Sequence, residues 1–219
     1  MSVYSKSISI ALGCCLIGSA YADSILTFEK IGSAGQKETR TVSISGRWLR
    51  IDSDAKSGPD YTLMDTGRML MFEVDEKNRR FKQTHMGKFY WPKDVIAKLK
   101  PMREKAVVSG VRCRKVEEID KDSTIAKHCM VAGADIGLNE RKTKSLSRLY
   151  LVSRRMKLDW GAATTPDERQ ISISSHNPST GDSLKFVSVV HKAIPDNRLK
   201  IPDEFQSILV KHEKHKHTK

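Results

Sequence analysis

The chain has 219 residues, of which 38% are hydrophobic and 30% are charged, a composition close to that of an ordinary globular protein. This length suits one domain with a real core and leaves no need for a second. Lysine and arginine exceed aspartate and glutamate by 13, which favours acidic partners such as lipid headgroups, anionic glycans or nucleic acid. The same composition fits a merely soluble surface, so charge alone does not select a partner.

Residues 1–22 have the pattern of a secretory signal peptide. Lys6 precedes an apolar run from Ile8 to Ile17, and small residues lead to Ala22, which is followed by Asp23. A membrane-spanning helix needs roughly 20 apolar residues, and this run is about half as long. The sequence therefore predicts cleavage between Ala22 and Asp23 and a periplasmic or secreted protein.

A lipoprotein signal ending at Cys14 is the alternative interpretation of this segment. Its apolar region would be very short, and Leu12 lies one position too close to the cysteine. Anchoring at Cys14 is therefore not expected.

The mature chain begins with short runs that read as strands separated by turn signals. Their regular spacing predicts a meandering antiparallel sheet. Val42 and Ile44 alternate with polar residues, while both faces of 68–75 are apolar, which predicts cover on both sides of that strand. The expected strands in this part are 24–30, 38–45, 47–52, 61–65, 68–75 and 79–85.

Two segments break the strand pattern and are expected to be helices. The first, 91–103, is opened by Pro92 and interrupted by Pro101. The second, 139–158, has apolar residues at helical spacing with basic residues around them. It is interpreted as a helix that covers the sheet, and the alternative is a basic amphipathic helix that binds membrane or nucleic acid. Further strands follow at 168–175 and 182–192.

The only cysteine pair outside the signal peptide, Cys113 and Cys129, is expected to form a disulfide after export. Strand-like runs at 111–118 and 123–131 flank the turn segment 119–122. A hairpin centred on Lys121 would place the two cysteines opposite each other. The disulfide would then close a loop, which should stabilise the fold by about 3 kcal/mol. A redox or metal-binding pair is the alternative, but there is no C-x-x-C spacing and His128 is a single neighbour.

The order of these elements resembles a family of bacterial envelope proteins of unknown function whose fold is similar to the lipoprotein carriers LolA and LolB. The likeness covers most of the mature chain, and its motifs are short and structural. The ending at Leu199 resembles the Phe-x-Ile-Pro ending of that family, with leucine in place of phenylalanine. The matching segments are 25–28, 46–52, 63–72, 110–116 with the strand ending in Cys129, and 199–205.

The resemblance implies an α+β fold: a curved antiparallel sheet, or half-barrel, with helices covering its concave face and an apolar cavity between them. One such domain would span 23–210, followed by a flexible basic tail at 211–219. In the carriers, the cavity holds lipoprotein acyl chains. The resemblance implies no catalytic residue.

A search for chemistry in the sequence gives weak signals. The histidines at 85, 128, 176 and 191 are scattered, and no H-E-x-x-H, G-x-S-x-G, G-x-G-x-x-G or P-loop pattern occurs. His212, His215 and His217 lie close together in the tail, but neighbouring lysines oppose cation binding there. No catalytic residue, metal site or cofactor is therefore expected, and the protein is expected not to be an enzyme.

Two binding hypotheses follow, with an envelope enzyme as a third that would need titratable groups clustered in a cleft. In the first, a carrier buries acyl chains of a lipid or lipoprotein between sheet and helix. Its candidate lining residues, each of which is interpreted first as part of an ordinary core, are Trp48, Met69, Met71 and Phe72.

In the second hypothesis, a basic module without an apolar cavity binds an anionic envelope polymer or a partner protein, and no nucleic-acid partner is expected. Salt dependence would separate the two, because screening weakens polymer binding and leaves acyl-chain burial largely unchanged. The residues assigned to this module are Arg141, Lys142, Lys144, Arg148, Arg154 and Arg155.

Overall fold

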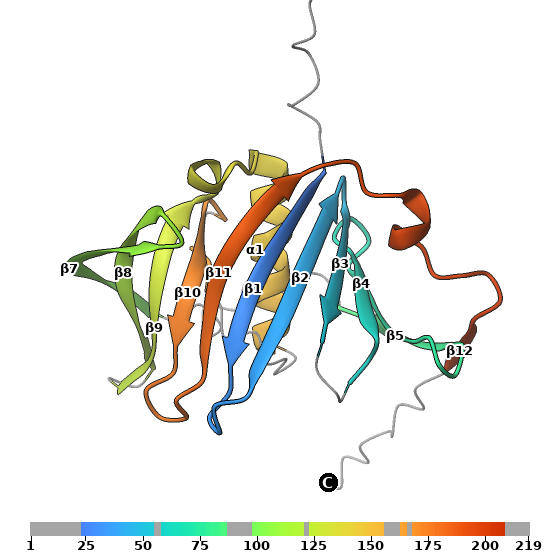
Figure 1. Cartoon of the computed structure of the whole chain (residues 1–219), viewed down its shortest axis with the longest axis horizontal. Helices are drawn as coiled ribbons and strands as arrows, with labels where there is room; N and C mark the ends of the chain where they lie inside the picture. Colours follow the sequence, from blue (N-terminus) through green and yellow to red (C-terminus); the bar gives the residue numbers. More distant parts are fainter. Residues whose placement is uncertain are drawn as a thin grey trace, which may run out of the picture.

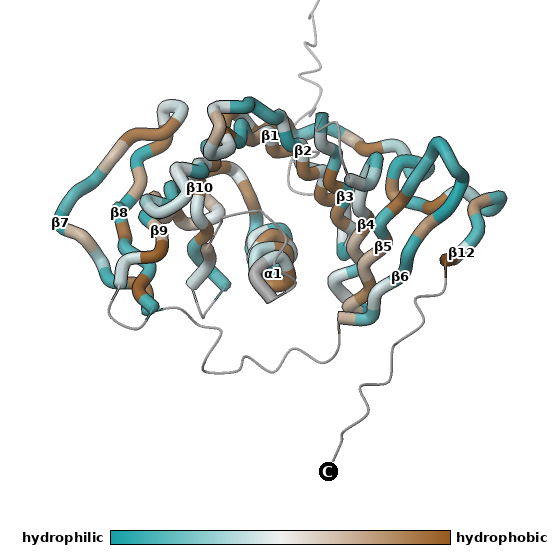
Figure 2. The backbone as a smooth tube through the Cα atoms, turned by 90° about the horizontal axis from the view of Figure 1, so that it is seen from below, coloured by the Kyte–Doolittle hydropathy of each residue, from teal (hydrophilic) through white to brown (hydrophobic). Residues whose placement is uncertain are grey.

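A computed structural model describes residues 23–54, 58–86, 98–120, 123–155, 163–165 and 168–208. Its strands form one large curved sheet, and α1 (Glu140–Arg155) lies on the concave side of the arc (Figures 1 and 2). Within the described ranges this is the one α-helix in that position, whereas two helices were expected from the sequence. None of the described helices is long and apolar enough to cross a membrane. The predicted signal peptide and the basic tail lie outside the described residues.

The sheet has the strand order β12-β6-β5-β4-β3-β2-β1-β11-β10-β9-β8-β7. Two meanders meet where β1 pairs with β11, and every pairing is antiparallel except that of β12 with β6. The strands are β1 (Ser24–Ile31), β2 (Lys37–Ser45), β3 (Trp48–Ser53), β4 (Tyr61–Asp65), β5 (Leu70–Asp75), β6 (Arg80–His85), β7 (Lys98–Val108), β8 (Val111–Asp120), β9 (Ser123–Ala132), β10 (Gln170–His176), β11 (Ser183–His191) and β12 (Gln206–Ile208), with 3-10 turns η1 (Gly133–Ile136) and η2 (Asp196–Leu199).

Most of the predicted elements are confirmed, but the helix predicted at 91–103 is wrong over its described part. Residues from Lys98 onward belong to β7, which pairs with β8, and 91–97 lie outside the described residues. Because β7 is the edge strand of the sheet, the missing N–H of Pro101 is tolerated there. Pairing with β8 thus overrides the helix-start signal that Pro92 provides.

The central core lies between α1 and the strands that cross it. Leu146 of α1 and Leu26, Ile44 and Leu49 of the sheet belong to one cluster, and each is 0% exposed. A side chain with no accessible surface adjoins no space large enough for a water molecule. These residues therefore form a filled core, in which each leucine contributes roughly 2 kcal/mol of burial.

A second, smaller cluster buries the other face of the β4–β6 region. Tyr61, Leu63 and Val74 pack there with Ile201 and Phe205 of the C-terminal segment. Met64, the neighbour of Leu63 in β4, belongs instead to the main core. The predicted cover on both sides of this part of the sheet is confirmed.

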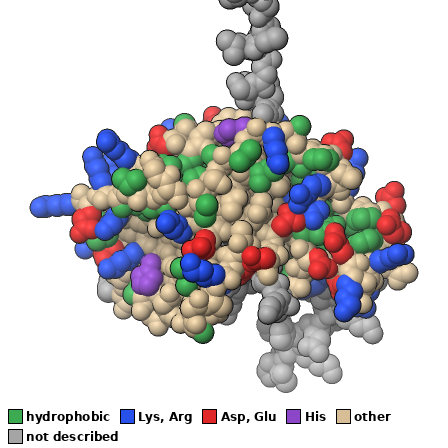
Figure 3. All heavy atoms as spheres, in the orientation of Figure 1, with side chains coloured by type: hydrophobic (Ala, Val, Ile, Leu, Met, Phe, Trp, Pro, Cys, Tyr) green, Lys and Arg blue, Asp and Glu red, His purple; other side chains and the backbone are tan. Residues whose placement is uncertain are grey.

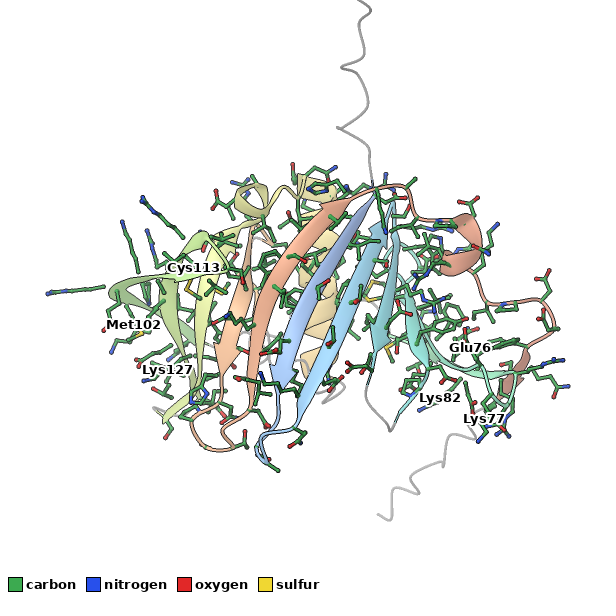
Figure 4. The ribbon with its side chains drawn as sticks, in the orientation of Figure 1. Glu76, Lys77, Lys82, Met102, Cys113 and Lys127 are labelled. Carbon is green, nitrogen blue, oxygen red and sulfur yellow. A yellow bond between two sulfur atoms is a disulfide. The ribbon has the colours of Figure 1, made fainter. Side chains whose placement is uncertain are left out.

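The β8–β9 hairpin carries the disulfide between Cys113 and Cys129, whose Cα atoms are 5.4 Å apart (Figure 4). The predicted pairing is present, but the predicted register is wrong, because Lys115 faces Cys129. A β-bulge between Glu118 and Ile119 shifts the strands relative to each other. The disulfide therefore joins positions that are offset along the hairpin.

Candidate functional site

A pocket of about 560 Å³ opens at the start of α1, where the β2–β3 and β4–β5 turns meet the first turns of the helix. All of its lining residues except Gly67 have polar or charged side chains, and four of these side chains are cationic. The lining residues are Arg47, Thr66, Gly67, Asn139, Glu140, Arg141, Lys144, Ser145 and Arg148.

Helical spacing decides which basic residues of α1 reach this pocket. Arg141, Lys144 and Arg148 follow one another at intervals of three and four residues and therefore share a face. Lys142 lies on another face, is 8% exposed and donates a hydrogen bond from Nζ to Ser24 Oγ at 2.9 Å. Burial lowers the pKa of Lys142, and the nearby Asp23 carboxylate opposes that shift.

The six basic residues assigned from the sequence to one module therefore do not act as one group. Three of them line the pocket, and Lys142 is a buried residue beside β1. The side chains of Arg154 and Arg155 lie outside the described residues.

The sheet side of the pocket is built from two hairpin turns whose backbones are joined. Thr66 donates from its backbone N and its Oγ1 to the Arg47 carbonyl, at 2.9 and 2.8 Å. Arg148 of α1 donates from Nη1 to the Thr66 carbonyl at 3.0 Å. Gly46 precedes Arg47 with φ of 56°, a left-handed conformation that glycine adopts readily. These bonds fix the turns relative to the helix.

Asp65 holds the Arg47 side chain in place. Its carboxylate is 1% exposed, and Oδ1 accepts hydrogen bonds from the backbone N–H groups of Gly67 and Arg68 at 2.9 and 3.0 Å. Asp65 Oδ2 lies 3.3 Å from Arg47 Nε. The Arg47 guanidinium also lies 5.7 Å from the centre of the Trp48 ring, although Trp48 is not itself a lining residue.

The pocket's cations differ in how well they are neutralised. Lys144 pairs with Glu140 at 2.9 Å, and Arg148 lies 4.0 Å from Glu168. Arg141 has no ion-pair partner anywhere in the described part of the chain. Asn139 caps the helix by accepting the Lys142 N–H at 3.0 Å, and the start of a helix carries partial positive charge. The arrangement suits an anionic group placed near Arg141.

The role of Arg47 and the meeting of the two turns were not predicted from the sequence. The sequence shows both turns, through Ser45-Gly46 and Thr66-Gly67, but not that they come together. They meet because Trp48 faces Asp65 across β3 and β4, which is a consequence of strand register. A prediction of this pairing would have placed Arg47 beside Thr66.

The four residues named from the sequence as lining an apolar cavity are not brought together. Met71 is buried in the main core, and Met69 packs against that core. Phe72 lies on the other face of β5, where it makes an edge-on contact with Phe81 at 6.0 Å between ring centres. Trp48 is half-buried beside Arg47. Together these residues do not outline one cavity.

A buried polar cluster joins β8, β9 and β10. His128 Nε2 lies 2.8 Å from Glu118 Oε2, and His128 Nδ1 lies 3.4 Å from Ser172 Oγ. The Ser172 hydroxyl donates to the Ser174 carbonyl at 2.8 Å, so its proton is already engaged. Burial lowers the pKa of His128 to about 4. All three side chains are buried away from solvent, so no substrate reaches the serine in this conformation.

The other predicted positions fall in several parts of the chain. Asp23 starts the described residues, and its carboxylate accepts the Ile194 N–H at 2.9 Å. Ala22 and the tail histidines lie outside the described residues. Within the described ranges, no three His, Cys, Asp or Glu side chains are grouped to hold a metal ion.

No protein-family model matches the chain, and no curated protein matches its sequence. Among solved structures, the fold is similar to that of an uncharacterized conserved protein from Thermus thermophilus. That similarity has a TM-score of 0.51 at 8% identity and covers 87% of this chain and 91% of the other.

Two further likenesses have lower TM-scores. One is to a chain of the Pseudomonas aeruginosa MucA/MucB complex, with a TM-score of 0.45 at 12% identity over 87% of this chain and 59% of that one. The other is to a LolA superfamily protein from Nitrosomonas europaea, with a TM-score of 0.31 at 6% identity over 84% and 91% of the two chains. At these identities the comparisons concern the fold alone.

Proposed function

We propose that this protein is a non-catalytic binding protein of the cell envelope, and that the pocket at the start of α1 binds an anionic group of an envelope component. The observation that carries the proposal is the lining of that pocket. Arg141 lacks an acidic partner among the described residues and lies beside Arg47, which forms an ion pair with Asp65, and Arg148, which donates a hydrogen bond to the Thr66 carbonyl. Guanidinium groups in such an arrangement suit phosphate or carboxylate oxygens.

The envelope location is supported by the signal-peptide pattern of residues 1–22 and by the Cys113–Cys129 disulfide. The non-catalytic assignment is supported by the burial of the one serine, histidine and glutamate group described above. A binding role requires only that ligand and pocket match in charge and shape.

Because the interior beside α1 is filled, an anionic group fits this protein as a ligand better than acyl chains do. Acyl chains would need space between α1 and the central strands, and the side chains described there are 0% exposed. The pocket at the helix start is open and lined by charge instead. We therefore place the recognised group in the pocket and assign no ligand to the core.

Fluorescence of Trp48 offers a direct binding assay, because its ring lies beside Arg47. The chain has three tryptophans, so the assay uses the mature protein with Trp91→Phe and Trp160→Phe. Two probes separate possible sources of the anion: dihexanoyl phosphatidylglycerol below its micelle concentration, and polyphosphate. Dihexanoyl phosphatidylcholine, which has no net charge, is the reference.

We expect one of the anionic probes to bind and Arg141→Gln with Lys144→Gln to weaken that binding about tenfold or more. The matched control is Lys37→Gln with Lys185→Gln, which removes the same charge from exposed positions outside the pocket. Equal affinity in the pocket variant and the control would overturn the proposal, as would equal binding of all three probes.

A further inference from the structure

The β7–β8 hairpin presents a compact basic surface at the end of the sheet opposite β12. Lys105 faces Arg114 and Val107 faces Arg112 across the two strands, so these four residues lie on one face of the hairpin. We call Lys105, Val107, Arg112 and Arg114 the outer face. All four are exposed, and Val107 is 64% exposed.

The opposite face of the same hairpin is attached to the domain. Ala106 faces Cys113 and Val108 faces Val111, and all four belong to the main core or pack against it. The Cys113–Cys129 disulfide ties β8 to β9, and Ser109 Oγ donates to the Phe186 carbonyl at 2.7 Å. The outer face is therefore held in a fixed position, with its side chains directed to solvent.

The outer face is electrostatically unfavourable by itself. Two cations opposite each other across antiparallel strands repel, because facing Cβ atoms lie about 5 Å apart. Lys105, Arg112 and Arg114 have no acidic partner in the portion of the chain that the structure describes. In contrast, Lys115 on the same hairpin pairs with Glu104 at 2.6 Å. Figure 3 shows lysine and arginine side chains projecting from this end of the molecule.

From this arrangement we infer that the outer face docks the protein on an anionic phospholipid surface. The three cations would meet lipid phosphates, while Val107 would enter the interfacial region between headgroups. A dissolved polyanion would also satisfy the cations, but it would gain little from an exposed valine. The combination of cations and an apolar side chain on one exposed face therefore favours a lipid surface.

This inference does not depend on the pocket at the start of α1, since the two sets of residues share no member. The pocket would select a group by its shape, whereas the outer face would hold the protein at a surface. The two activities can therefore fail independently.

Cosedimentation of the mature protein with vesicles tests the inference. The vesicles contain phosphatidylcholine with 30 mol% phosphatidylglycerol, and pure phosphatidylcholine vesicles are the reference. We expect the combined Lys105→Gln, Arg112→Gln and Arg114→Gln variant to lower partitioning about 100-fold. We expect Val107→Ser to lower it about fivefold while leaving the binding of dextran sulfate unchanged.

The charge-matched control is Lys37→Gln, Lys77→Gln and Lys185→Gln, which neutralises three exposed lysines elsewhere on the sheet. This control is expected to retain vesicle binding. An equal loss in the control would attribute binding to net charge and overturn the inference. Retention of full vesicle binding by Val107→Ser would also overturn it, in favour of a soluble polyanion. Thermal unfolding of each variant verifies that it folds.

Discussion

The pocket at the start of α1 and the outer face of the β7–β8 hairpin both gather positive charge, but they hold it differently. In the pocket, Arg47 and Lys144 have acidic partners and Arg148 is tied to a backbone carbonyl, so that Arg141 is the one lining cation without a partner among the described residues. On the outer face, no cation has such a partner among the described residues. Partnered cations are fixed in direction, and unpartnered cations remain free to reorient. The same excess of basic residues thus gives a shaped site in one region and an adaptable surface in the other.

Because of this difference, binding at the two regions should respond to different changes in structure and solvent. The pocket depends on the turns, the helix cap and the core beneath α1, so changes to local structure should alter its affinity. The outer face depends on the attachment of the β7–β8 hairpin and on ionic strength.

Removal of the disulfide should have the largest effect on stability. Replacing Cys113 and Cys129 by serine opens a link between residues separated by 16 positions, which should cost about 3 kcal/mol of unfolding free energy. Denaturant unfolding measures this loss. In native buffer we expect pocket affinity to persist while vesicle binding falls, because the disulfide holds the hairpin and not α1. A parallel loss of pocket affinity would show that the two regions are not separable.

Acidification should destabilise the strands next to the hairpin through His128. Because burial lowers its folded-state pKa to about 4, below the ordinary 6.5, the unfolded chain binds more protons between these values. Stability should therefore fall as the pH drops from 6.5 toward 4, by about 2.5 kcal/mol from this residue at pH 4.5. Denaturant unfolding across this range measures the slope. His128→Gln should have a shallower slope, and an unchanged slope would contradict the assignment.

The cap of α1 offers a finer test of the pocket. Asn139→Ala removes the acceptor of the Lys142 N–H and should cost about 1 kcal/mol of unfolding free energy. Asn139→Asp retains a capping oxygen and adds negative charge to the pocket lining. We expect the aspartate variant to keep wild-type stability in thermal unfolding but to bind an anionic probe several-fold more weakly. Unchanged affinity in that variant would argue against an anionic ligand at this position.

Raising the ionic strength should weaken binding at the two regions to different degrees, and this is the smallest of the expected effects. Raising NaCl from 50 to 500 mM should weaken both interactions, but more steeply on the outer face, whose cations are exposed and have no acidic partner among the described residues. Vesicle cosedimentation and Trp48 fluorescence at a series of salt concentrations give the two slopes. Equal slopes would mean that the partnered cations of the pocket provide no shielded environment.

The sequence predicted most strands because alternation and turn residues act locally. Val42 and Ile44 face the core as their spacing indicates, and the apolar residues on both faces of β5 are covered on both sides. The prediction failed at 98–103, where pairing with β8 along the sheet edge decides the conformation. It also failed in the register of the disulfide hairpin, because Asp120 faces Ser123 at the turn, one position away from the predicted pairing, and the bulge after Glu118 adds one more position.

The candidate site was predicted only in part, for a related reason. Helical spacing gathers Arg141, Lys144 and Arg148 on one face, and these cations were identified as a basic group. Lys142 was assigned to the same group, but it points into a buried position beside Ser24. The contribution of Arg47 depends on two turns meeting through strand pairing, which one sequence does not display.

The most direct test of the pocket's role is a crystal structure of the mature protein with the anionic probe that binds. The account predicts phosphate oxygens within hydrogen-bonding distance of Arg141 and Arg47, with Leu146 and the core beneath α1 unchanged. Acyl chains of the probe inserted between α1 and the central strands, with Leu146 displaced and the pocket empty, would contradict it and restore the carrier hypothesis.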